Sequence, residues 1–148
     1  MNAALQASAA VVVRRTIHAP AEVLFDAFLD PIALSEWMRP GAIRSAVATV
    51  EPYVGGRYEV VMQAESGPIP HTGVYRLIDR PRRLVFTWHS PNTGPSETLV
   101  TVDFVKQPVG TEVVVTHELL PEAARPSHSR GWTSGLEHLD ETCTRGRA

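Results

Sequence analysis

Hydrophobic and polar positions alternate with a period of two along most of the chain. Seven such segments, some of them β-branched runs, are bounded by proline-, glycine- or asparagine-rich turns, which is typical of strands. The predicted strands span residues 11–17, 43–50, 57–63, 72–78, 84–89, 98–106 and 112–119. The connections after residue 50 are too short for helical crossovers, so they predict antiparallel hairpins.

Helical spacing interrupts this alternation after the first strand. Leu24, Phe25 and Phe28 recur at helical spacing and predict a helix over about 20–29. A second short helix is predicted over about 30–38, where it ends before a Pro-Gly pair.

A third helical pattern begins after Pro126, where Ser127 is the predicted N-cap. Trp132, Leu136, Leu139 and Cys143 then follow at steps of four, three and four, which places them on one helical face. A twisted antiparallel sheet needs a cover for its apolar face, and this helix is the long element that remains. The predicted fold class is therefore α+β, with a curved sheet of about seven strands wrapped around a C-terminal helix.

Length and composition fit a single domain over residues 1–148, with tails at 1–10 and 144–148. The chain is 43% hydrophobic, and its 14 basic against 16 acidic residues give a net charge of −2. This balance argues against a disordered protein and against a nucleic-acid-binding domain. The sequence contains no apolar run long enough to span a membrane, and the apolar start lacks the basic segment of a signal peptide. A single cysteine excludes an internal disulfide, so a cytoplasmic location is expected.

Catalytic and metal-binding motifs are not found in the sequence. The six histidines show no H-E-x-x-H spacing, no serine lies in a G-x-S-x-G elbow, and the Gly55-Gly56 pair is expected to form a turn. We therefore predict no metal site and no cofactor.

Strand alternation places large apolar side chains on the concave face of the sheet, together with one histidine, His117. Two interpretations of His117 stay open. It is either a polar anchor or acid/base group for a ligand, or a buried histidine bonded to protein groups. The large apolar residues leave a similar choice, because they either line a pocket or pack into a filled core.

Three stretches of the sequence resemble the START-like (SRPBCC) superfamily and, within it, the family named after the activator of the heat-shock-protein-90 ATPase. The first is RRTIHAPAEVLFDAF at 14–28, with Trp37-Met38 beyond it. The second is VGGRY at 54–58 with GVYRLIDRPRRLVFTW at 73–88. The third comprises VTVDF at 100–104, GTEV at 110–113, THE at 116–118 and Gly131-Trp132. The resemblance covers the chain from about residue 11 to residue 143.

This resemblance implies a helix-grip fold and a cavity for apolar small molecules under the C-terminal helix. Some superfamily relatives are polyketide cyclases. The eukaryotic co-chaperone uses a version of the domain beside a separate N-terminal domain, which has no counterpart in these 148 residues. The matching residues carry no catalytic motif.

We therefore expect binding of a small hydrophobic or aromatic ligand in an internal cavity, by a monomer or homodimer without nucleic-acid or membrane partners. The candidate cavity-lining residues are Phe28, Trp37, Met38, Val60, Met62, Tyr75, Phe86, Trp88, Val102, Val115, His117, His128, Trp132 and Leu136. One alternative is a polyketide cyclase- or dehydratase-like enzyme that uses His117. The other is a co-chaperone-like module that contacts a chaperone.

Overall fold

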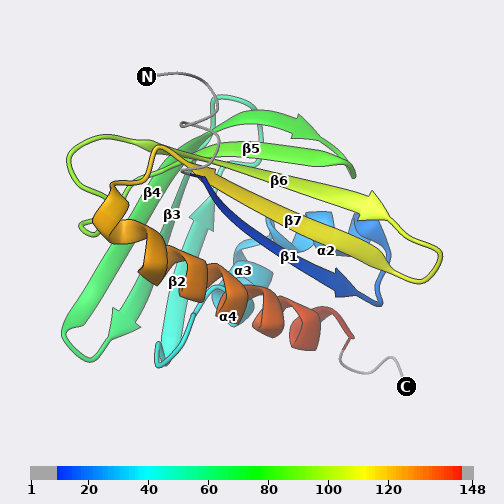
Figure 1. The fold of residues 1–148 in the computed structure, drawn as a ribbon, viewed down its shortest axis with the longest axis horizontal. Coiled ribbons are helices and arrows are strands. Elements are labelled where there is room, and N and C mark those ends of the chain that lie inside the picture. Colours follow the sequence, from blue (N-terminus) through cyan, green and yellow to red (C-terminus); the bar gives the residue numbers. More distant parts are fainter. Residues whose placement is uncertain (1–9, 145–148) are drawn as a thin grey trace.

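A curled antiparallel sheet surrounds one long helix in the computed structural model, which describes residues 10–144 (Figure 1). Of the predicted tails at 1–10 and 144–148, residues 1–9 and 145–148 lie outside the described residues. Thr144 is the last residue of the C-terminal helix, so this helix extends one residue into the predicted tail.

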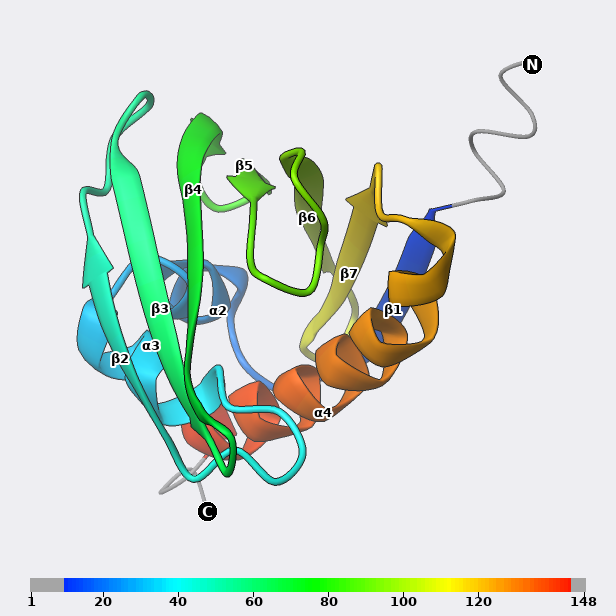
Figure 2. The same cartoon turned by 90° about the vertical axis from the view of Figure 1, so that its left-hand side faces the viewer.

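Seven strands form one sheet in the order β1-β7-β6-β5-β4-β3-β2, and every neighbouring pair is antiparallel. The strands are β1 (Val11–Ile17), β2 (Ser45–Val50), β3 (Arg57–Ala64), β4 (Gly67–Asp79), β5 (Arg83–Trp88), β6 (Thr98–Lys106) and β7 (Thr111–Glu118). Figure 2 shows how the sheet curls from β2 to β1 while the C-terminal helix crosses its open side. The predicted helix-grip architecture is confirmed.

The helices are α2 (Ala21–Ala27), α3 (Pro31–Trp37), the 3₁₀ turn η1 (Glu122–Ala124) and α4 (Arg125–Thr144). The two short helices follow β1 as predicted. Asp30 caps α3, because its carboxylate accepts hydrogen bonds from the backbone N–H groups of Ile32 at 2.8 Å and Ala33 at 3.4 Å. Pro31 occupies the first turn, where a missing N–H costs no helical hydrogen bond.

Helix α3 lies against β2, which is an edge strand of the sheet. The Ser35 hydroxyl accepts a hydrogen bond from the backbone N–H of Ala48 at 3.2 Å and donates one to the Pro31 carbonyl at 2.8 Å. A helix side chain therefore satisfies a strand donor that has no neighbouring strand.

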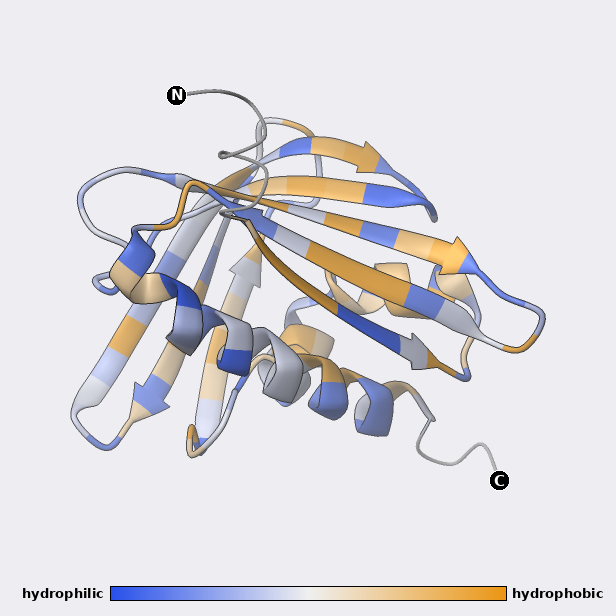
Figure 3. Ribbon diagram, in the orientation of Figure 1, coloured by the Kyte–Doolittle hydropathy of each residue, from blue (hydrophilic) through white to orange (hydrophobic). Residues whose placement is uncertain are grey.

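The core lies between the concave face of the sheet and α4. Alternate residues of β6 are buried as the sequence pattern predicts, and β7 follows the same pattern apart from three consecutive buried valines. In Figure 3 both strands are largely orange, with blue or pale bands between the orange stretches. On α4 the predicted apolar face, from Trp132 to Cys143, is buried.

Strand β4 starts five residues before the predicted Thr72, and it contains Pro68 and Pro70. Thr72 exchanges backbone hydrogen bonds with His89, so even-numbered residues of this part of β4 direct their N–H groups away from β3. Strand β5 does not extend along this end of β4, so the missing proline N–H groups have no ladder bond to lose. The turn expected around Pro68 is in fact strand.

Two further local predictions are wrong. Helix α4 begins at Arg125, so Ser127 is not its N-cap; the Ser127 hydroxyl donates to the Ala124 carbonyl at 3.1 Å from within the first turn. Pro126 is tolerated there, because N–H groups of a first turn have no helical acceptor. Leu119, which alternation places on the concave face, is 74% exposed, because its left-handed backbone (φ 68°) ends β7 one residue earlier.

Candidate functional site

A cavity of about 190 Å³ lies between the sheet and the first half of α4. Its walls come from the end of α3 and the loop after it, from β3, β4 and β5, and from α4. The lining residues include no aspartate, glutamate, lysine or arginine. The site is therefore a largely apolar space with two histidines, one asparagine and one serine in its walls.

The helical wall of this cavity contains two glycines one turn apart, Gly131 and Gly135. A Cβ at Gly135 would lie 3.7 Å from the ring of Trp37, and one at Gly131 would lie 3.9 Å from Pro40, so both positions have room for a methyl group. Glycine inside a helix costs about 0.5–1 kcal/mol relative to alanine. The two glycines thus leave space in the cavity, and they make α4 less stable than alanines would.

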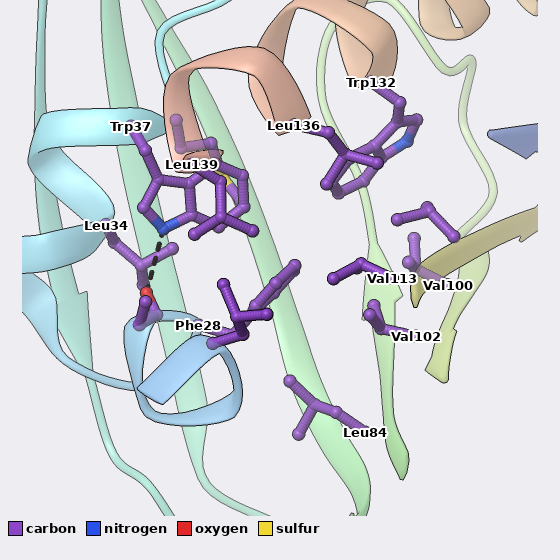
Figure 4. Packing of buried hydrophobic residues seen from close by; sticks show 14 of the residues in the cluster. Phe28, Leu34, Trp37, Leu84, Val100, Val102, Val113, Trp132, Leu136 and Leu139 are labelled. Atoms are coloured by element: carbon purple, nitrogen blue, oxygen red, sulfur yellow. Dashed lines mark hydrogen bonds between the residues drawn. The ribbon is translucent and has the colours of Figure 1, made fainter. Parts of the chain in front are cut away.

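Aromatic rings line the cavity from both the sheet and the helix. The Trp88 ring centroid lies 5.0 Å from that of His71 and 5.4 Å from that of Trp132. Figure 4 shows Trp132 and Leu136 directed from α4 toward the strands, and Trp37 beside Leu139. Flat rings from a strand and from a helix therefore face the same space.

The three tryptophan N–H groups differ in their partners. Trp37 Nε1 donates to the Ala27 carbonyl at 2.9 Å (Figure 4), and Trp132 Nε1 donates to His117 Nδ1 at 3.0 Å. Trp88 Nε1 is buried and has no hydrogen-bond partner within residues 10–144. A buried donor of this kind costs about 1–3 kcal/mol when it stays unpaired.

His117 is fully buried and bonded on both ring nitrogens. Since Nδ1 accepts from Trp132, the ring hydrogen is on Nε2 and is donated to Thr98 Oγ1 at 2.7 Å. The Thr98 hydroxyl donates in turn to the Trp88 carbonyl at 2.7 Å. Burial, with a smaller contribution from neighbouring His128, lowers the pKa of His117 to about 3. This neutral ring has no nitrogen left for a ligand. The geometry therefore favours the interpretation of His117 as a buried histidine bonded to protein groups.

The two histidines in the cavity wall each have one nitrogen bonded to the backbone. His71 Nδ1 donates to the Val60 carbonyl at 3.2 Å, and His128 Nδ1 donates to the Ala124 carbonyl at 2.8 Å. Burial lowers the pKa of His71; the carbonyls of Val60 and Ile69 oppose this shift, and His128 adds to it. His71 is therefore neutral at neutral pH.

The candidate residues from the sequence divide into three groups. Six line the cavity: Trp37, Met38, Met62, Trp88, His128 and Trp132. Met38 also borders a void of about 10 Å³, which is walled in part by Phe28, Val60, Tyr75 and Phe86. Val102, Val115, His117 and Leu136 line neither space, because they pack within the core.

Eight lining residues were not among the candidates. They are Pro40, Ile43, Ile69, His71, Asn92, Ser127, Gly131 and Gly135. The two glycines had a detectable signal, since they stand four residues apart on the side of the helix that carries Trp132 and Leu136. The loop residues had none, because their position depends on how the loop folds back over α4.

A larger recess of about 970 Å³ on the outer face of the sheet has a different character. Its cations are paired: Arg83 with Asp103 at 2.7 Å, Arg80 with Asp26 at 2.8 Å and Arg14 with Glu112 at 3.9 Å, for example. These pairs neutralise one another and leave no free charge to attract a ligand. The largely apolar cavity under α4 is the better candidate site.

Comparison with known proteins identifies the family of the chain. The model of the Activator of Hsp90 ATPase homolog 1-like protein family matches residues 18–144. The chain belongs to this family. A search of curated proteins finds no match.

Solved structures of this family's fold superpose over most of the chain. A protein from Chromobacterium violaceum is 24% identical, with a TM-score of 0.80 over 92% of this chain and 97% of that one. An HSP90 activator from Plasmodium falciparum is 26% identical, with a TM-score of 0.72 over 89% and 93% of the two chains. The AHSA1-like protein from Aeromonas hydrophila is 22% identical, with a TM-score of 0.72 over 90% of each chain. Among the described residues of our AHSA1-like chain, no helix is long and apolar enough to cross a membrane.

Proposed function

We propose that this AHSA1-like domain binds a small, flat, apolar molecule in the cavity under α4, without covalent chemistry. The observation that carries the proposal is the space of about 190 Å³ whose helical wall contains Gly131 and Gly135. An apolar cavity of about 150 Å³ is enough to bind benzene. The space therefore fits a ligand built on one aromatic ring.

The geometry does not support catalysis by His117. A general acid or base must reach the reacting group with a nitrogen that is free to exchange a proton. Both nitrogens of His117 are occupied by Thr98 and Trp132, so the cyclase-like alternative loses the residue on which it depended.

The test uses para-xylene as an apolar probe, titrated into the purified protein by calorimetry. Native mass spectrometry is run first to detect any molecule that co-purifies. Gly131→Leu should fill the cavity and abolish para-xylene binding while the protein stays folded. Thr133→Leu is the matched control, because Thr133 is exposed on the same helix and is not a lining residue. The proposal is wrong if the wild type binds neither para-xylene nor its hydroxyl analogue para-cresol, or if Gly131→Leu binds para-xylene as well as the wild type does.

A chaperone-binding role is the second candidate, and the similarity to the HSP90 activator from Plasmodium falciparum favours it. Such a role predicts a stable complex with an HSP90-type chaperone, detectable by size-exclusion chromatography of the mixture. It also predicts that Gly131→Leu, which changes the cavity wall, binds the chaperone as well as the wild type does. Separate elution of the two proteins would exclude this candidate.

A further inference from the structure

Two neighbouring rings of the cavity wall carry a donor and an acceptor that no described residue pairs. Trp88 is 4% exposed, and its Nε1–H has no partner. The other rings around it cannot serve as acceptors: His117 uses both nitrogens elsewhere, and Trp132 has only a donor, which it gives to His117. The described residues therefore leave this donor without a hydrogen bond.

His71 supplies the complementary group. Its Nδ1 must carry the ring hydrogen, because the Val60 carbonyl can only accept. In the neutral ring the distal nitrogen, Nε2, is therefore a free acceptor. The ring centroids of His71 and Trp88 are 5.0 Å apart, yet the two side chains share no hydrogen bond.

His128, the other histidine of the cavity wall, does not offer the same pairing. Its Nδ1 is also bonded to a backbone carbonyl, but its ring contacts that of His117 at 5.3 Å rather than that of Trp88. The adjacent donor and acceptor are thus Trp88 and His71.

The charge of the lining limits the ligand further. No lysine or arginine is there to pair with a carboxylate, and no aspartate or glutamate to pair with an amine. Moving an unpaired charge out of water into such a site is strongly unfavourable. A neutral ligand is required.

We propose that the cavity selects a neutral aromatic alcohol or phenol, whose hydroxyl oxygen accepts from Trp88 Nε1–H while its hydrogen is donated to His71 Nε2. A hydroxyl group fits because it accepts and donates through one atom. This inference rests on the proposed cavity-binding function and specifies its ligand class.

The experiment compares three probes of similar shape: para-cresol, para-xylene and para-toluate. Their dissociation constants are measured by calorimetry with wild type, Trp88→Phe and His71→Phe. A hydrogen bond to a buried group is worth about 1 kcal/mol, so each variant should lower the preference for para-cresol over para-xylene by roughly five- to tenfold. Para-toluate should bind none of the three proteins measurably.

Phe86→Leu is the control for loss of an aromatic core residue, because Phe86 is buried on the same strand but does not line the cavity. It should keep the wild-type preference between the two probes. Circular dichroism confirms that each variant is folded before titration.

Two results overturn the ligand class while cavity binding stands. One is an unchanged preference in both Trp88→Phe and His71→Phe. The other is para-toluate binding as tight as that of para-cresol. If neither neutral probe binds the wild type, cavity binding itself is wrong and the ligand class with it.

Discussion

Trp132 on α4 donates its indole hydrogen to Nδ1 of His117 on β7, over 3.0 Å in the buried core. The same imidazole is bonded through Nε2 to Thr98 on β6, and Thr98 is bonded to the carbonyl of Trp88 on β5. One polar chain therefore joins the helix to three neighbouring strands. Its direction requires a neutral His117 with the hydrogen on Nε2.

This requirement makes stability depend on pH. The pKa of His117 is lowered by burial from 6.5 to about 3 in the folded protein, so between these values the unfolded chain binds a proton that the folded one does not. The stability that depends on neutral His117 is fully present above pH 6.5 and is lost as the pH falls toward 3. The free energy of unfolding should fall by up to about 1.4 kcal/mol per pH unit from this group. Urea titrations between pH 6.5 and 5 should show a shallower slope for His117→Gln than for wild type, and equal slopes would contradict the prediction.

The chain of hydrogen bonds should also behave as a unit. Thr98→Val keeps the side-chain shape but leaves the His117 Nε2–H unpaired, and Trp132→Phe leaves Nδ1 unpaired. Each change should lower the free energy of unfolding by about 1–3 kcal/mol, because a buried polar atom loses its partner. The double variant should lose less free energy of unfolding than the sum of the two single losses. Fully additive losses would show that the two bonds act independently.

Gly131→Ala should raise stability. The site is in a helix interior, and the new methyl group meets only Pro40 at 3.9 Å. The expected gain is about 0.5–1 kcal/mol, measured by chemical denaturation. The same substitution should weaken para-xylene binding, since it reduces the cavity. A gain in stability with unchanged para-xylene binding would mean that Gly131 does not line the space that para-xylene occupies.

The opposite result is expected for Gly73→Ala on β4. A Cβ there would collide with the Thr87 carbonyl oxygen and would lie 2.6 Å from the Tyr58 hydroxyl, which crosses above the glycine to donate to that same carbonyl. Overpacking of this kind costs about 1–3 kcal/mol. Tyr58→Phe should cost less, about 1 kcal/mol, because it removes one hydrogen bond and no volume. Thermal denaturation of the two variants gives this order, and a larger loss for Tyr58→Phe would refute it.

The strands, the alternation of buried and exposed residues along them, and the buried face of α4 could be predicted because they depend on local periodicity. Alternation alone places Leu84, Phe86 and Trp88 on the concave face, where they are buried. Local patterns failed where long-range pairing decides the conformation. Pro68 and Pro70 have the signature of a turn, and only the absence of β5 beside them permits a strand.

The site was less predictable than the fold. His117 differs from a free cavity histidine only through Thr98 and Trp132, which lie 19 and 15 residues away in sequence. The cavity itself is a difference between the volume enclosed and the volume filled, so it depends on where Pro40 and Trp37 come to rest against α4. No periodicity in the sequence encodes how closely these two residues approach α4.

The bond between Ser35 and Ala48 bears on how copies of this chain meet one another. An edge strand with free N–H and C=O groups is a template on which another strand adds, which is the first step toward fibrous aggregates. On β2 the Ala48 N–H is already taken by the hydroxyl of a helix that lies alongside. An incoming strand would have to displace α3, whose Trp37 also packs against the cavity. Protection from polymerisation and maintenance of the binding space therefore depend on the same seven-residue helix.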